Sequence, residues 1–232
     1  MNAIWAVVPA AGSGSRMALS QPKQFVEIAG RSLLDWSLSA VLADTRVRRC
    51  MVALPRGAAQ QIDSQGVGDA RLGYCQGGET RAESVAAGIA ALEAEDDDWV
   101  LVHDAARPCL SAADLKRLID EVTTKGIGGL LALPLTDTLK RGDARNGVLN
   151  TIDRAGLWRA QTPQMFRVAE LRAALLAARD ARLTVTDEAS AMELAGHEVL
   201  LVEGSSVNLK VTFPEDLKVA DLWLAERGTH GE

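Results

Sequence analysis

Short runs of apolar residues recur along the chain, separated by stretches in which apolar residues return every three or four positions. Such runs are typical of strands buried on both faces, whereas the wider spacing places apolar side chains on one face of a helix. The predicted strands are residues 3–9, 47–54, 99–103 and 130–133, the predicted helices begin at residues 33, 80 and 115, and further regular structure is expected at 168–179, 188–194, 198–202 and 215–226. Because strands alternate with helices, we expect right-handed βαβ units and an α/β fold with a mainly parallel sheet.

Residues 134–160 break this pattern, since they are polar, contain glycine and have only weak periodicity. A connection of more than about 15 residues without regular structure is long for a compact domain. Two interpretations stay open: an ordinary surface loop, or an arm that reaches outside the body of the protein. The chain shows no repeat, low-complexity tract or domain linker, so we expect residues 1–232 to form a single domain.

The composition narrows the classes of function. The chain has 232 residues, 47% hydrophobic and 24% charged, with a formal net charge of −6 at pH 7. This acidic balance argues against a general affinity for nucleic acid or anionic membranes, which need a basic surface. No stretch approaches the ~18 apolar residues of a membrane span, and the first residues lack the basic region of a signal peptide. We therefore expect no nucleic-acid or membrane partner, and a cytoplasmic location.

The segment after the first predicted strand is rich in glycine and serine, with Gly12 and Gly14 two positions apart. Open α/β sheets bind ligands beyond the carboxyl ends of their strands, and glycine lets backbone N–H groups approach anionic oxygens closely. A plain strand-to-helix turn has the same pattern. A dinucleotide-binding loop needs a third small residue where Met17 stands, and the Gly-Lys-Ser/Thr sequence of a P-loop is absent. Arg16 and Lys23, beside the loop, favour a polyphosphate ligand over these alternatives.

A second candidate segment, residues 102–108, follows the predicted strand at 99–103 and is expected at the same edge of the sheet. Its Asp104 can hold a divalent metal through a hard oxygen ligand. The alternative is a structural aspartate that pairs with Arg107 in a turn. The three histidines of the chain have no partners at the spacing of a zinc site.

Six segments carry motifs in one consistent order, and each is modest by itself. They are PAAGSGSRM (9–17), PKQ (22–24), GGETRAESV (77–85), VHDAARP (102–108), TDEAS (186–190) and NLKVTFPED (208–216). Together they closely resemble the 2-C-methyl-D-erythritol 4-phosphate cytidylyltransferase family of the non-mevalonate isoprenoid pathway. The resemblance runs from about residue 4 to residue 224. It implies a Rossmann-like nucleotidyltransferase fold of the glycosyltransferase-A-like type, a divalent cation, usually Mg²⁺, and a homodimer. It also implies that residues 134–160 form a β-arm that crosses to the partner subunit.

The resemblance further implies roles for single residues. Arg16 and Lys23 are the expected catalytic cations, and Asp104 is the expected metal ligand. The expected nucleotide-binding residues are Ala10, Ala11, Gly12, Gly14, Gly78, Glu79, Ser84, Asp104, Ala105 and Arg107. The expected substrate-binding residues are Thr138, Arg154, Thr162, Thr186 and Lys210. Thr138 and Arg154 are expected to reach the substrate from the partner's arm.

The implied reaction transfers the cytidylyl group of CTP to 2-C-methyl-D-erythritol 4-phosphate and releases pyrophosphate. A phosphate monoester has a second pKa near ~6, so it is already a dianionic nucleophile and needs no general base. One alternative is a cytidylyltransferase for another polyol phosphate, such as ribitol 5-phosphate. A dinucleotide-binding oxidoreductase is disfavoured by Met17. A non-catalytic nucleotide sensor is disfavoured by Arg16 and Lys23, because binding alone needs fewer cations.

Overall fold

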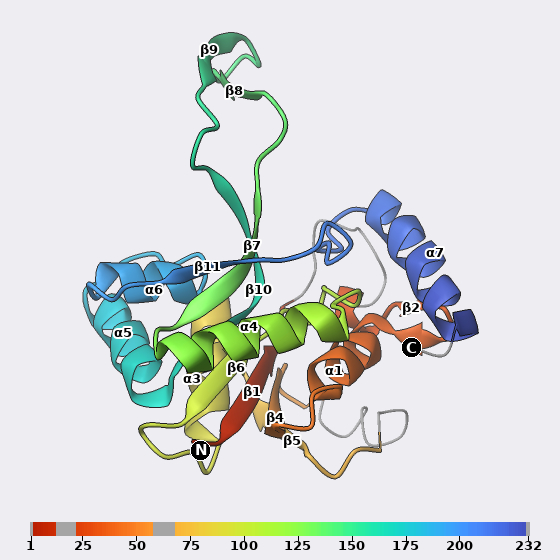
Figure 1. The fold of residues 1–232 in the computed structure, drawn as a ribbon, viewed down its shortest axis with the longest axis vertical. Coiled ribbons are helices and arrows are strands. Elements are labelled where there is room, and N and C mark those ends of the chain that lie inside the picture. Colours follow the sequence, from red (N-terminus) through yellow and green to blue (C-terminus); the bar gives the residue numbers. More distant parts are fainter. Residues whose placement is uncertain (1, 13–21, 58–67, 231–232) are drawn as a thin grey trace.

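The computed structural model describes residues 2–12, 22–57 and 68–230. Their centre is a seven-stranded sheet (Figure 1). The strands are β1 (Ile4–Pro9), β4 (Val47–Leu54), β5 (Leu72–Gln76), β6 (Trp99–Val102), β7 (Gly129–Pro134), β10 (Trp158–Arg167) and β11 (Leu200–Glu203). They lie side by side in the order β11-β7-β10-β6-β1-β4-β5. All neighbours are parallel except β10, which is antiparallel to both β6 and β7. The predicted mainly parallel sheet is thus confirmed.

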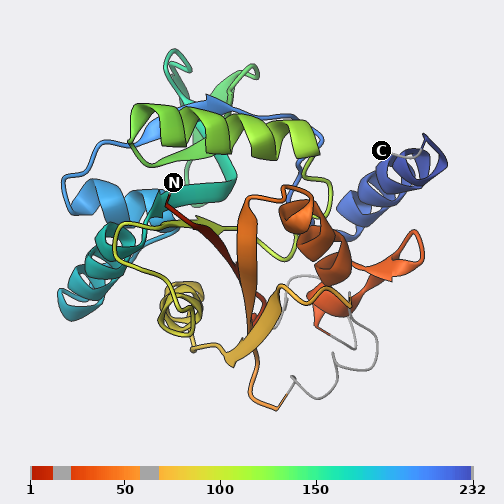
Figure 2. The same ribbon diagram turned by 60° about the horizontal axis from the view of Figure 1, so that its bottom comes forward.

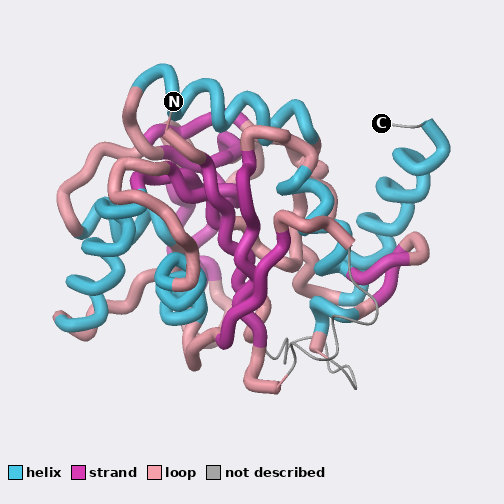
Figure 3. Tube along the Cα trace, turned by 90° about the horizontal axis from the view of Figure 1, so that it is seen from below, coloured by secondary structure: helices cyan, strands magenta, loops and turns pink. Residues whose placement is uncertain are grey.

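Helices cover both faces of the sheet. One face carries α1 (Leu33–Leu42) and α4 (Ala112–Lys125), and the other carries α3 (Arg81–Ala90), α5 (Val168–Asp180) and α6 (Glu188–Leu194). Figure 2 shows α4 and α3 on opposite sides of the strands, and Figure 3 shows the twisted strands between the helices. The last helix, α7 (Pro214–His230), packs against the small hairpin of β2 (Glu27–Ile28) and β3 (Arg31–Ser32). No helix in the described ranges is long and apolar enough to cross a membrane.

Strand β1 shows why the apolar runs are continuous. Ile4, Ala6 and Val8 belong to the core under α1 and α4, whereas Trp5 and Val7 belong to the core under α3 and α5. Side chains of a strand alternate between its two faces, so a strand covered on both faces is apolar at every position. The same burial on both faces holds for β6.

The register of the sheet gathers three loops at one edge. In β1, Val7 lies beside Val102 of β6, and Pro9 lies beside Ala53 of β4. The N–H of Gly77, after β5, donates to the carbonyl of Leu54 at 2.8 Å. The segments that follow β1, β5 and β6 therefore leave the sheet side by side at the carboxyl ends of parallel strands.

The structure differs from the sequence prediction at several elements. Strands β5 and β10 and the hairpin of β2 and β3 were not predicted, and the helix expected to begin at residue 80 runs from Arg81 to Ala90. In β10 the polar residues Arg159, Gln161 and Gln164 interrupt the apolar pattern, yet Gln161 and Gln164 are almost fully buried. The amide NH2 group of each has an acceptor within the protein: Gln161 donates to the carbonyl of Ser205 at 2.9 Å, and Gln164 donates to Asp187 Oδ2 at 2.9 Å.

Between β7 and β10 the chain forms an arm, defined here as residues 135–157, that projects from the body (Figure 1). Its outer part is the antiparallel hairpin of β8 (Leu139–Gly142) and β9 (Val148–Ile152). Of the two interpretations left open for residues 134–160, the arm is the one that the structure adopts. Val148 and Leu149 are 67% and 62% exposed, which is unusual for adjacent large apolar residues.

Candidate active site

A cavity of about 260 Å³ opens at the carboxyl edge of the sheet. Five segments form its wall, namely the one at the end of β1, the one with Lys23 and Gln24, the start of α3, the one after β6 and the one before α7. Its lining residues are Pro9, Ala10, Ala11, Gly12, Lys23, Gln24, Gly78, Glu79, Thr80, Arg81, Ser84, Asp104, Ala105, Ala106, Lys210 and Thr212. Of the predicted nucleotide-binding residues, all line this cavity except Arg107 and Gly14, and Gly14 lies outside the described residues.

Two glycines let the turn before α3 pass close to the neighbouring segments. A Cβ atom on Gly77 would lie 2.7 Å from the Cβ of Ala11, and one on Gly78 would lie 2.3 Å from the Cβ of Glu83. Glu83 also completes the N-cap of α3, because its carboxylate accepts the N–H of Thr80 while the Thr80 hydroxyl accepts the N–H of Glu83. The positive end of the α3 dipole therefore lies at the cavity wall, where it favours an anion.

Asp104 is the most strongly held charge at the cavity. Its carboxylate is 9% exposed and lies 2.9 Å from Arg81 Nε and 2.8 Å from Lys210 Nζ. Burial alone would raise the pKa of Asp104, but the charges of Arg81 and Lys210 outweigh it and hold this pKa well below its usual range. The side chain is therefore a fixed anion that faces the cavity.

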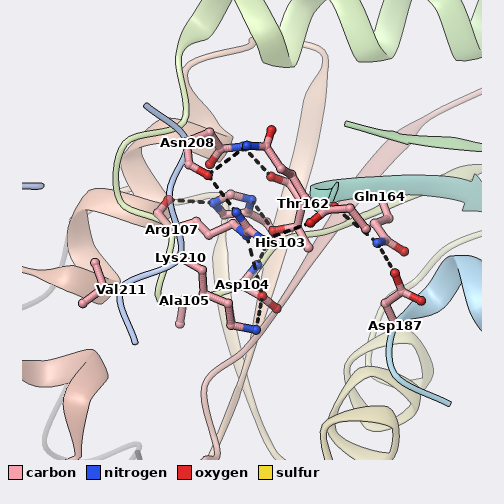
Figure 4. A network of polar contacts seen from close by, with 12 residues as sticks. His103, Asp104, Ala105, Arg107, Thr162, Gln164, Asp187, Asn208, Lys210 and Val211 are labelled. Carbon is pink, nitrogen blue, oxygen red and sulfur yellow. Dashed lines mark hydrogen bonds and ion pairs between the residues drawn. The ribbon is translucent and has the colours of Figure 1, made fainter. Parts of the chain in front are cut away.

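His103 and Thr162 support Asp104 from behind (Figure 4). The Asp104 N–H donates to Thr162 Oγ1 at 3.0 Å, and Thr162 Oγ1 lies 3.1 Å from His103 Nδ1. His103 Nε2 lies 3.0 Å from the carbonyl of Arg107, which needs a donor at that nitrogen. Burial lowers the pKa of His103 to about 4, so the ring is neutral at pH 7. His103 is thus a structural support and has no free nitrogen for catalysis.

Arg107 does not line the cavity, and its Nε lies 3.9 Å from Asp104 Oδ2. Its side chain is buried, and its guanidinium donates to the carbonyls of Asn208 at 2.7 Å and Ala160 at 3.4 Å. The amide of Asn208 in turn donates to the carbonyl of Thr162 at 2.8 Å (Figure 4). Arg107 therefore ties the segment after β6 to β10 and to the segment before α7. It supports the cavity wall without lining it.

Lys23 lies at the mouth of the cavity, in the short 3-10 helix η2 (Lys23–Phe25). Its ammonium donates to the carbonyl of Val211 at 3.1 Å. The neighbouring Gln24 is buried and donates to the carbonyl of Ala10 at 2.7 Å. These contacts join η2 to the segments after β1 and before α7. The other predicted catalytic cation, Arg16, lies outside the described residues.

The predicted substrate-binding residues do not meet at one place within this chain. Lys210 lines the cavity, and Thr162 is buried behind it. Thr186 is exposed just before α6 and does not line the cavity. Thr138 and Arg154 are exposed on the arm, where Arg154 donates to the carbonyl of Thr136. Within one chain the arm points away from the body, as Figure 1 shows.

The sequence predicted no role for Arg81 or Glu188, although both lie in motifs that carry the family resemblance, residues 77–85 and 186–190. Arg81 lines the cavity, contacts Asp104 and forms a buried ion pair with Glu188. The one available signal was a charged residue in each of two short motifs. Nothing in the spacing of residues 81, 104 and 188 indicates that their side chains meet.

Asp104 fits a metal that is shared with a bound nucleotide. Within residues 2–12, 22–57 and 68–230, no three His, Cys, Asp or Glu side chains are placed to hold a metal ion. Magnesium commonly binds one or two carboxylates and takes its other ligands from substrate phosphates and water. The ionised Asp104 at the cavity wall matches that donor set.

Comparison with known proteins gives one consistent result. A family profile described as IspD, 2-C-methyl-D-erythritol 4-phosphate cytidylyltransferase, matches residues 4–226. A curated relative of that name from Bordetella petrii is 49% identical over 230 residues, which are 96% of this chain and 99% of the relative.

Solved structures agree in fold. A crystal structure of 4-diphosphocytidyl-2C-methyl-D-erythritol synthase matches with a TM-score of 0.83 and 37% identity, over 97% of this chain and 99% of that one. The 2-C-methyl-D-erythritol 4-phosphate cytidylyltransferase of Francisella tularensis matches with a TM-score of 0.83 and 33% identity, over 95% and 99%.

The buried neutral His103 predicts a loss of stability in acid. Its pKa is about 4 in the folded protein against 6.5 for the free side chain, so the unfolded chain binds the proton first as pH falls. Stability from this residue is complete above about pH 6.5 and falls as pH drops toward 4, by up to about 3 kcal/mol. Urea unfolding at pH 7 and pH 4.5 measures the loss, which we expect to shrink in His103→Gln. The exposed His197→Gln is the control, and equal losses in wild type and His103→Gln would contradict the assignment.

Proposed function

The chain belongs to the 2-C-methyl-D-erythritol 4-phosphate cytidylyltransferase family, and from this premise we propose the reaction that it catalyses. It transfers the cytidylyl group of CTP to 2-C-methyl-D-erythritol 4-phosphate, giving 4-diphosphocytidyl-2-C-methyl-D-erythritol and pyrophosphate. The chain is a cytidylyltransferase of isoprenoid biosynthesis. The observation that carries the proposal is the cavity at the carboxyl edge of the sheet, where a glycine turn, a helix N-terminus and the side chains of Lys23, Asp104 and Lys210 meet.

The chemistry of this reaction needs no general base from the protein. The attacking phosphate is mostly a dianion at neutral pH and needs no proton removed. His103, the one histidine beside Asp104, has both ring nitrogens engaged. The obstacle is repulsion between this dianion and the triphosphate, so catalysis rests on positioning and on fixed positive charge.

Cations beside the phosphates are proposed to carry the catalysis. Lys23 at the mouth of the cavity and Arg16 in the preceding loop would stabilise charge at the α-phosphorus and on the departing pyrophosphate. Arginine can fork across two phosphate oxygens, whereas lysine acts as a point charge. Lys210, whose side chain is 44% exposed, has the freedom to bind the phosphate of the polyol substrate.

The remaining wall is proposed to hold the nucleoside. The backbone of residues 10–12, together with Gly14, would pass along the phosphates. Gly78, Glu79 and Ser84 would face the cytosine, and Ala105 would lie by the ribose. For Arg107 the geometry supports a bracing role.

Asp104 is proposed to be the protein ligand of a divalent cation, Mg²⁺ or one of similar preference. Bound there, the cation would neutralise charge on the nucleotide phosphates. Asp104 would bind this cation through its carboxylate, which the neighbouring charges of Lys210 and Arg81 keep ionised.

The arm is proposed to complete the active site of a partner in a homodimer. Thr138 and Arg154 lie on the arm, which projects from the body of its own chain. The exposed Val148 and Leu149 at the arm supply apolar surface for such a contact. Thr138 and Arg154 would then bind the polyol phosphate together with Thr186. Thr162 would support the part of the active site that holds this substrate. A cytoplasmic location follows from the proposed use of CTP.

A pyrophosphate-release assay tests the substrate assignment directly. With CTP and Mg²⁺, we expect turnover on 2-C-methyl-D-erythritol 4-phosphate and little on ribitol 5-phosphate. The reason is that the family profile for the first substrate matches residues 4–226, which include the cavity and the arm. Preferred turnover on ribitol 5-phosphate would overturn the substrate assignment. If no pyrophosphate is released with both polyol phosphates, the proposal that the chain is a cytidylyltransferase for these substrates is overturned.

The two proposed catalytic cations give a sharper prediction. We expect Arg16→Lys and Lys23→Ala each to lower kcat by about 100-fold, or ~3 kcal/mol, the usual cost of one donor to transition-state charge. Steady-state kinetics measures this loss. Lys125→Ala, an exposed lysine paired with Glu121 on α4, is the matched control and should behave as wild type. The assignment fails when both cation variants keep near-native turnover.

Mixed dimers test the arm. In a dimer of one Arg154→Ala chain and one Lys23→Ala chain, an exchanged arm leaves one site with both residues intact. After the two inactive variants are unfolded together and refolded, random pairing should restore about a quarter of wild-type activity. Each variant refolded alone is the control. A mixture no more active than its parents would show that the arm serves its own chain.

A further inference from the structure

Arg81 joins two buried carboxylates that come from distant parts of the chain. Its Nε donates to Asp104 Oδ1 at 2.9 Å, while Nη1 and Nη2 donate to Glu188 Oε1 and Oε2 at 2.6 and 3.0 Å. Arg81 is the first residue of α3, Glu188 is the first residue of α6, and Asp104 follows β6. Three elements of the fold therefore meet at one guanidinium.

Glu188 does not reach the cavity. Its side chain is 1% exposed, and it is absent from the cavity wall, whereas Arg81 is part of that wall. Two parallel hydrogen bonds between arginine and carboxylate are the strongest and most directional form of this pair. Glu188 therefore contacts the cavity wall at Arg81.

The backbone that carries Glu188 is itself held against the sheet. Asp187 caps α6 by accepting the N–H of Ser190 at 3.0 Å. Gln164 of β10 donates to Asp187 Oδ2 at 2.9 Å and accepts the N–H of Ala189 at 2.8 Å, and Figure 4 shows Gln164 facing Asp187. These bonds on both sides of Glu188 fix its position relative to β10, the strand that also supports Asp104 through Thr162.

The arginine fork matters because of the ligand proposed for the cavity. A guanidinium matches the geometry of phosphate oxygens as well as that of a carboxylate. An unrestrained Arg81 could turn its two Nη atoms toward a triphosphate and leave Asp104. With both Nη atoms bound to Glu188, Nε is the atom that donates to Asp104, and the arginine keeps one orientation.

We propose that Glu188 is a positioning residue, which holds the Arg81 guanidinium in the cavity wall so that Arg81 keeps the Asp104 carboxylate directed into the nucleotide site. The inference rests on the proposed function, since it concerns the residues that would bind CTP. It assigns Glu188 to the cytidylyl transfer although Glu188 touches neither substrate.

The first test compares the same substitution at two places on α6. Glu188→Gln keeps the shape of the side chain and removes its charge, and Glu193→Gln makes this change at an exposed position. We expect kcat/KM for CTP to fall about 10- to 100-fold in Glu188→Gln, as for other residues that orient a ligand-binding group. Glu193→Gln should match wild type. A Glu188→Gln enzyme with wild-type kcat/KM overturns the proposal.

A double-mutant cycle separates positioning from general support of the fold. We expect Glu188→Gln to lower kcat/KM little further in an Arg81→Lys background, because the residue that it acts through is already altered. Losses in kcat/KM that simply multiply would show that Glu188 acts independently of Arg81, and would overturn the proposal. Thermal unfolding of all variants is recorded alongside, and it is not expected to follow the same cycle.

A measurement on the wild-type protein does not depend on any variant folding. In a ¹⁵N NMR spectrum without nucleotide or metal, we expect a resolved Arg81 Nε–H signal that exchanges slowly with water. A signal averaged with those of exposed arginines would overturn the proposal. Wild-type protein that releases no pyrophosphate with CTP and the polyol phosphate would instead overturn the proposed function, whatever this spectrum shows.

Discussion

The cavity wall is organised around the buried carboxylate of Asp104, two residues after β6. Removing a charge from water is costly unless oppositely charged groups and hydrogen bonds surround it. Here α3 supplies Arg81, the segment before α7 supplies Lys210, and β10 supplies the Thr162 hydroxyl that accepts the Asp104 N–H. These groups can meet only when the sheet has its observed strand order, with β10 beside β6. The cavity wall and the sheet topology therefore depend on each other.

The cavity is lined by several cations although the chain as a whole is acidic. The formal net charge is −6, which does not favour polyanions in general. At the cavity, however, the cations Lys23, Arg81 and Lys210 line the wall together with the carboxylates of Asp104 and Glu79, and the N-terminus of α3 adds its dipole. Selectivity for a triphosphate can thus arise from a few oriented groups in a small volume, without a basic surface elsewhere.

The proposed nucleotide-binding residues and two of the proposed substrate-binding residues lie on different parts of the chain. The body carries the cavity and the network behind it, in which Arg107, Asn208 and Thr162 hold the segments after β6 and before α7 against strand β10. The arm carries Thr138 and Arg154 away from that body. A substrate site assembled from two chains makes activity depend on assembly, since neither chain alone would present every proposed contact.

The sequence alone determined the regular core and most of the cavity wall. Strands β1, β4 and β6 were predictable because burial on both faces demands unbroken apolar runs, as in residues 50–54 of β4. The loops after β1 and β6 were predictable as neighbours, because parallel strands present their carboxyl ends at one edge. The family motifs predicted ten nucleotide-binding residues. Eight of these line the cavity, Ala10 and Ser84 among them.

Only the tertiary structure decided which polar side chains meet. Strand β10 was hidden because its buried glutamines break the apolar pattern, and their burial is possible only through partners elsewhere in the chain. Arg107 belongs to a recognised motif, yet it braces the wall instead of lining it. The pairing of Arg81 with Glu188 spans 107 positions. Periodicity records which face of an element is buried, whereas an ion pair depends on the three-dimensional placement of two elements, which no local pattern encodes.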